Sequence, residues 1–112
     1  MSEERRSSRH HVWLPVKVDD LKEGIALTHD ASPHGVLMVT ASTLDVGADV
    51  ALDLKLPAPH EKLHRLHGRV VRVEPNADDP HGLWPYRMAV ELDPAAPELD
   101  RLLSIVESLT SH

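Results

Sequence analysis

Apolar residues recur at every second position in residues 48–56. No other feature of the sequence constrains the possible fold as strongly as this alternation. The apolar positions are Ala48, Val50, Leu52, Leu54 and Leu56, with Asp49, Ala51, Asp53 and Lys55 between them. Successive side chains of a β-strand point to opposite faces, so a period of two is typical of a strand with one buried face. We therefore expect a half-buried strand here.

Five further segments show strand patterns, namely residues 12–18, 24–29, 35–41, 63–74 and 84–92. Residues 35–41 are almost continuously apolar, which predicts a strand covered on both faces. Pro15 cannot donate a ladder hydrogen bond and predicts an edge position for the first strand, and disturbed alternation around Gly68 predicts a bulge or bend. Six short strands joined by turn-forming residues predict a small antiparallel barrel.

The C-terminal segment has a helical period. Its apolar residues are Leu99, Leu102, Leu103, Val106 and Leu109, spaced as in an amphipathic helix. Pro97 suits a first helical turn, so we expect a helix over residues 97–110 packed on the barrel. The 112 residues are enough for one domain. The expected fold is all-β with a terminal helix: a flexible arm over residues 1–11, then a six-stranded antiparallel barrel with its C-terminal α-helix over residues 12–112.

Composition and charge exclude several classes of protein. The chain has no cysteine for a disulfide or a thiolate zinc site, and it has no run of about 18 apolar residues for a membrane span. The polar start is unlike a signal peptide, which favours a cytoplasmic protein. The net charge of −6 argues against a nucleic-acid partner.

The charge is unevenly distributed along the chain. Residues 1–17 carry a net charge of +2, which comes from Arg5, Arg6, Arg9 and Lys17 against Glu3 and Glu4. Arginine pairs two-pronged with phosphate oxygens, and its plane also stacks on flat rings. Arg5 and Arg9, four residues apart on a flexible arm, could close over a ligand that bears phosphates and bases. The alternative is a solvated basic terminus.

A second motif lies between the second and third expected strands, over residues 30–35. Asp30 can accept hydrogen bonds from a base edge or cap its own turn. Ser32 offers a hydroxyl, and Gly35 permits the positive φ of a tight turn. The alternative is an ordinary hairpin whose turn is closed by Asp30.

Together, Arg5-x-x-x-Arg9 and Asp30-x-Ser32-x-x-Gly35, with 20 residues between them, resemble the hallmark of the PilZ domain family. The resemblance covers nearly the whole chain and implies a six-stranded barrel that acts as a bacterial receptor for the second messenger cyclic di-GMP. It implies that Arg5 and Arg9 hold the phosphates and stack on guanine, and that Asp30 and Ser32 hydrogen-bond a guanine edge and the ligand backbone. The chain departs from the family in having no Phe late in the last strand.

Two functions follow as hypotheses. The first is a receptor that binds cyclic di-GMP through the arm, needs no cofactor, and relays the signal to an unidentified effector protein. The second is a PilZ-like scaffold that acts through protein contacts without nucleotide. Arg6 and Trp84 are possible secondary ligand contacts, although Trp84 on the inward side of the last strand also suits the core. In the family, an Arg directly before the first motif accompanies a stacked pair of ligands, and Glu4 at that position predicts one ligand per chain.

Catalysis and metal binding are not expected. Asp30, Ser32 and His34 lie too close along one turn for a hydrolytic triad. His60, His64 and His67 lie in an expected loop and strand, where their spacing does not converge on a metal ion.

Overall fold

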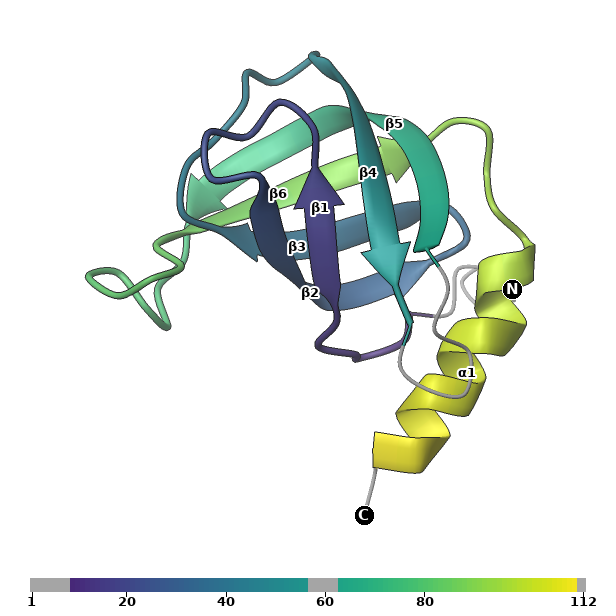
Figure 1. Cartoon of the computed structure of the whole chain (residues 1–112). Coiled ribbons are helices and arrows are strands. Elements are labelled where there is room, and N and C mark those ends of the chain that lie inside the picture. The colour runs from purple at the N-terminus through teal and green to yellow at the C-terminus, as the bar shows by residue number, and fades with distance from the viewer. Residues whose placement is uncertain (1–8, 57–62, 111–112) are drawn as a thin grey trace, which may run out of the picture.

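A computed structural model describes residues 9–56 and 63–110 of the chain (Figure 1). It contains six strands and one helix: β1 (Pro15–Val18), β2 (Ile25–Ser32), β3 (Gly35–Thr40), β4 (Asp49–Lys55), β5 (Leu63–Pro75), β6 (Tyr86–Leu92) and α1 (Glu98–Thr110). The strands form a closed barrel in the order β1-β2-β3-β6-β5-β4, and all neighbours are antiparallel. This confirms the predicted six-stranded antiparallel barrel with a C-terminal helix.

The barrel interior holds the alternating apolar residues that defined the strands. Val16, Leu52, Leu54, Met38 and Met88 are fully buried. Helix α1 adds its apolar stripe to the same core, with buried residues Leu99, Leu103 and Val106. The helix therefore lies beside one end of the barrel and covers it (Figure 1).

The edge position predicted from Pro15 is wrong. Strand β1 pairs with β2 on one side and with β4 on the other, because the barrel is closed. Pro15 is the first residue of its strand, and the pairing with β4 begins at Val16. A proline is tolerated at that position because its missing donor removes no internal ladder bond.

The bulge predicted around Gly68 lies slightly further along the same strand, at Val71. Strand β5 pairs regularly with β4 through Gly68, and its register against β6 shifts between Val70 and Arg72. Gly68 instead permits a close approach, since a Cβ there would overlap the carbonyl oxygen of Glu91 in β6.

The last strand begins later than predicted, at Tyr86 rather than Trp84. The backbone of Trp84 is bonded to the preceding loop, because its N–H donates to Asp79 Oδ2 at 3.0 Å and its carbonyl accepts from Asn76 Nδ2 at 2.7 Å. These loop contacts replace strand pairing at Trp84. The side chain of Trp84 is half-buried and is not on the inward stripe of β6.

Candidate functional site

The β2–β3 hairpin carries the second sequence motif. Ser32 pairs with Gly35, so the turn consists of Pro33 and His34 alone. The Ser32 hydroxyl accepts a hydrogen bond from the His34 amide at 3.2 Å and closes the turn. Ser32 is buried, and its hydroxyl thus has a structural role in addition to any contact with a ligand.

Gly35 does not have the positive φ that the sequence suggested. The positive-φ residues in the described part of the chain are Gly24 and Gly47. A Cβ on Gly35 would lie 3.1 Å from the carbonyl oxygen of Val90, which belongs to the neighbouring strand β6. The glycine therefore allows the hairpin and β6 to approach each other, and a left-handed turn is not the reason for its presence.

Asp30 joins the two sequence motifs. Its Oδ1 lies 2.6 Å from Nη1 of Arg9, and its Oδ2 lies 3.3 Å from Nδ1 of His29. The Asp30 side chain is 9% exposed and that of Arg9 is 52% exposed, so a buried carboxylate is paired with a largely accessible guanidinium. The register of β2 against β3 shifts between Thr28 and Asp30, which leaves His29 as an extra residue and redirects the chain at Asp30.

The two motifs meet in one hollow of about 530 Å³ on the outside of the barrel. It crosses the four consecutive strands β2, β3, β6 and β5. Its lining includes the described motif residues Arg9, Asp30, Ser32 and Gly35. The structure therefore brings together all the predicted site residues that it describes except Trp84.

Two predicted arginines and one tryptophan lie apart from this hollow. Arg5 and Arg6 fall outside the described residues. Trp84 precedes β6 at the end where Tyr86 pairs with Thr40, whereas Gly35 pairs with Glu91 near the other end of the same strand. Trp84 therefore does not flank the hollow, and the structure does not support it as a ligand contact.

The hollow includes residues that the sequence did not point to. Leu37 and Ala89 give it an apolar floor, and the bulge in β5 adds Val71 and Arg72. Val71 is 46% exposed, and Arg72 has an ion pair with Glu74 at a distance of 3.5 Å. The Val70-Val71 doublet, which interrupts the alternation of β5, is the sequence signal that could have located them.

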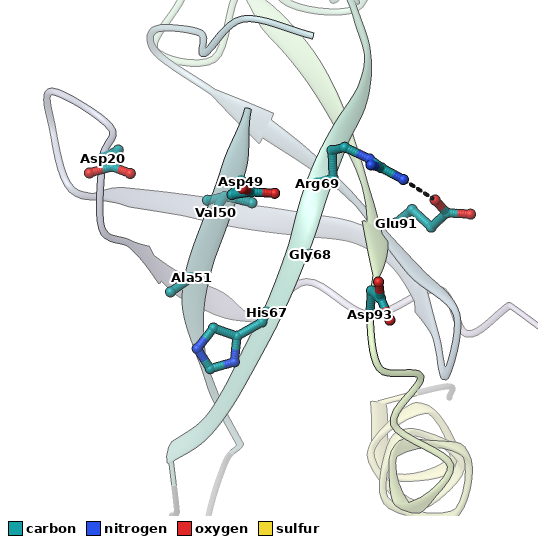
Figure 2. A pocket seen from close by; sticks show the side chains of 9 residues that line it. All are labelled: Asp20, Asp49, Val50, Ala51, His67, Gly68, Arg69, Glu91 and Asp93. Atoms are coloured by element: carbon teal, nitrogen blue, oxygen red, sulfur yellow. Dashed lines mark ion pairs between the residues drawn. The ribbon is translucent and has the colours of Figure 1, made fainter. Parts of the chain in front are cut away.

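A second hollow of about 420 Å³ lies across β4, β5 and the end of β6 (Figure 2). It shares Glu91 with the first hollow. Four of its lining residues are acidic: Asp20, Asp49, Glu91 and Asp93. Its one arginine, Arg69, lies 3.7 Å from Glu91 and is paired with it (Figure 2). Excess negative charge disfavours a phosphate-bearing ligand here, so the hollow that contains the motifs is the better anion site.

Residues 9–11, which the sequence assigns to the end of a flexible arm, make specific polar contacts in the structure. His10 forms two backbone hydrogen bonds with Ala31, of 2.8 and 3.0 Å. Its ring nitrogens lie 3.1 Å from Asp100 Oδ1 and 3.1 Å from Glu107 Oε1 in α1. Residues 9–11 are thus tied to both β2 and α1, because the buried histidine fills the space between them.

Charge and burial act in opposite directions on this histidine. Desolvation by burial lowers the pKa of His10, but hydrogen bonds to Asp100 and Glu107 and their negative charges together raise it above 6.5. The pKa of Glu107 is lowered below 4.5, first by the hydrogen bond from the His11 amide and then by His10. The contacts with Asp100 and Glu107 therefore favour the charged form of His10.

Within residues 9–56 and 63–110, no three His, Asp or Glu side chains are grouped closely enough to hold a metal ion. The helix in this part of the chain is too short and too polar to cross a membrane.

The PilZ domain family model matches residues 3–108 of the chain. Because the match covers nearly the whole sequence, the protein belongs to the PilZ domain family, as its two motifs and its fold indicate. No curated protein matches the chain by sequence.

Two solved structures share the fold. The inhibitor of motility MotI (DgrA) from Bacillus subtilis is 20% identical with a TM-score of 0.73, and the alignment covers 98% of this chain and 53% of that chain. The chain thus spans about half the length of MotI. The PilZ domain of YcgR from Escherichia coli, whose structure contains cyclic di-GMP, is 17% identical with a TM-score of 0.65, with 96% of this chain and 92% of that chain covered.

Proposed function

We propose that this protein is a receptor for cyclic di-GMP and that the nucleotide binds in the hollow over β2, β3, β6 and β5. The observation that carries the proposal is the Arg9–Asp30 ion pair, which joins the arginine motif to the hairpin motif at the edge of that hollow. Family membership and the cyclic di-GMP in the YcgR structure support the same ligand.

The chemistry of the hollow suits a guanine nucleotide. A guanine edge presents N–H donors, which a carboxylate such as that of Asp30 accepts, and it presents O6 and N7 acceptors, which an arginine fork binds. Arg9 reaches the hollow from the arm and Arg72 reaches it from β5. In a protein of net charge −6, these guanidiniums offset the overall repulsion of a ligand with two phosphate charges.

The apolar floor supplies the second part of the recognition. Leu37 and Ala89 face outward from neighbouring strands, and the bulged Val71 extends this surface toward β5. A guanine ring that packs on this floor buries apolar area at about 25 cal/mol per Å². Arg5, from the same motif, then closes over the phosphates, and the ordered arm offers a new surface to the effector protein.

Amide chemical shifts recorded during a titration with cyclic di-GMP test this assignment. We expect the largest shift changes at Asp30, Leu37 and Arg72, and small changes at Asp20 and Asp49 in the acidic hollow. GMP at the same concentration serves as the control and should bind much more weakly, because it lacks the second base. A titration without shift changes would favour the alternative of a scaffold that binds no nucleotide.

A further inference from the structure

The side chain of His10 lies between the start of the chain and helix α1. It is 10% exposed, and each of its two ring nitrogens faces a carboxylate oxygen of α1 at 3.1 Å, Nε2 toward Asp100 and Nδ1 toward Glu107. These partners are 90 and 97 residues away in sequence, so the contacts join the two ends of the domain.

The geometry of these contacts determines the protonation state of the ring. An ionised carboxylate only accepts hydrogen bonds, and a neutral imidazole has a single N–H donor. Both contacts are hydrogen bonds only when both ring nitrogens carry a hydrogen, that is, when His10 is an imidazolium. Loss of one proton turns one of the two hydrogen bonds into a contact between two acceptors, which is repulsive.

The backbone connects this ring to the candidate site. His10 exchanges two hydrogen bonds with Ala31 in β2, and the His11 amide donates to Glu107 Oε2 at 2.9 Å. Arg9, one residue before His10, pairs with Asp30, one residue before Ala31. The position of Arg9 over the hollow is therefore linked to the contacts that His10 makes with α1.

We propose that doubly protonated His10, with Asp100 and Glu107, forms a latch that holds α1 against the start of the barrel and positions Arg9 over the hollow. The groups that face His10 from α1 are these two carboxylates. On β2, Asp30 precedes the Ala31 that pairs with His10, and its carboxylate is engaged by Arg9 and His29. The raised pKa of His10 agrees with a latch that is closed below about pH 6.5 and opens as the pH rises.

Opening the latch loosens the helix without detaching it, because Leu99, Leu103 and Val106 remain in the core. The link to the ligand rests on the proposed function. If the closed latch positions Arg9 for the nucleotide, affinity for cyclic di-GMP falls as the pH rises, and by linkage the nucleotide raises the apparent pKa of His10. His10 is in this sense a positioning residue that acts through Arg9.

The latch itself is tested on the protein without nucleotide, by NMR of the His10 ring and of the His11 amide. We expect both ring nitrogens of His10 to carry hydrogen at about pH 6, and its titration midpoint to lie above 6.5. The protection of the His11 amide against hydrogen exchange, corrected for the pH dependence of the intrinsic exchange rate, should fall about tenfold once the His10 ring is neutral. A decrease of this size is in line with the loss of a hydrogen bond to a charged group.

Two helix variants separate the latch from general stability. Asp100→Asn and Glu107→Gln should each lower the His10 midpoint, because each removes one facing negative charge. Glu98→Gln is the matched control, since Glu98 is an exposed carboxylate in the first turn of α1, and it should leave the midpoint nearly unchanged. A singly protonated ring at about pH 6, or equal effects of all three variants, would overturn the latch.

The nucleotide titration then tests the coupling. We expect wild-type affinity to fall several-fold between about pH 6 and pH 8.5, and we expect His10→Gln to weaken binding and flatten this dependence. His81→Gln, at an exposed site in the β5–β6 loop, should retain the pH dependence of the wild-type affinity. Equal pH profiles for wild type and His10→Gln would refute the positioning role. Absence of binding at every pH would refute the proposed function instead, while the NMR result for the latch would stand.

Discussion

Nη1 of Arg9 lies 2.6 Å from Oδ1 of Asp30, and this contact joins two sequence motifs whose charged residues are 21 positions apart. The carboxylate is buried and the guanidinium is half exposed, so one face of the arginine remains accessible to a ligand. The pair also fixes where the arm meets the barrel, at the edge of the hollow that we assign to cyclic di-GMP.

Arg72 should contribute to nucleotide affinity although it lies outside both motifs. Arg72→Ala removes one of the two described arginines that line the hollow, and a lost charge-assisted contact costs about 1.5–3 kcal/mol. We expect affinity for cyclic di-GMP to fall about tenfold in a calorimetric titration.

Arg65→Ala is the matched control for this prediction. Arg65 lies in the same strand and is about half exposed, but it pairs with Asp19 and Asp53 and lines neither hollow. Its loss should change affinity little. An equal effect of the two substitutions would place the ligand elsewhere or reduce the role of Arg72 to general charge.

Gly68 should be intolerant of any side chain for reasons of packing. An Ala Cβ there would overlap the Glu91 carbonyl oxygen and Val90, so β5 and β6 would have to separate, at a cost of about 3 kcal/mol. At Gly24, with a φ of +75° and open space around it, Ala costs only the conformational penalty of about 1 kcal/mol. Urea unfolding of both variants compares the two, and a smaller loss for Gly68→Ala would contradict the close approach of the strands.

The strands were predictable because alternation is a local signal, and the helix because its apolar spacing is local too. The hollow was less predictable, because its shape depends on bulges at His29 and Val71 whose positions are set by register against neighbouring strands. The sequence indicates that Gly35 matters, but it suggests a positive φ as the reason. In the structure a side chain is excluded by the close approach of β6, which is more than 50 residues away in sequence.

The role of His10 had no local signal at all. In the sequence it is one of two adjacent histidines after a basic segment, and its partners Asp100 and Glu107 lie at the other end of the chain. Only the closure of the barrel and the packing of α1 bring these three side chains together.

The latch predicts a pH dependence of stability with a definite sign. The pKa of His10 is raised in the folded protein, so its contribution is complete below about 6.5, the pKa of a free histidine, and is lost as the pH rises through the folded value. The pKa of Glu107 is lowered, so its contribution is lost as the pH falls through a folded value below 4.5. The free energy of unfolding of wild type relative to His10→Gln, about 1 kcal/mol, should therefore be largest between these two limits. An advantage that grows above pH 8 would contradict the assignment.

The number of ligands per chain should depend on the residue before the arginine motif. Glu4 and Glu3, which lie outside the described residues, put two negative charges next to the arginine motif in the sequence, and a stacked pair of ligands carries four phosphate charges that they would repel. We expect one cyclic di-GMP per chain, and Glu4→Arg should raise the stoichiometry toward two. Saturation at two ligands in the wild-type protein would show that Glu4 does not set the number.

The measurement that tests the central claim most directly is calorimetric titration of cyclic di-GMP into the wild-type protein and into Arg9→Ala. We expect saturable binding that weakens about tenfold or more without Arg9, through loss of a charge-assisted phosphate contact, and a modest fall of the thermal midpoint, because the buried Asp30 carboxylate loses its ion-pair partner. Arg101→Ala, at an exposed position in α1, should bind as wild type does. No saturable binding by the wild type, or equal affinity of wild type and Arg9→Ala, would contradict the proposal that this hollow is a cyclic di-GMP site.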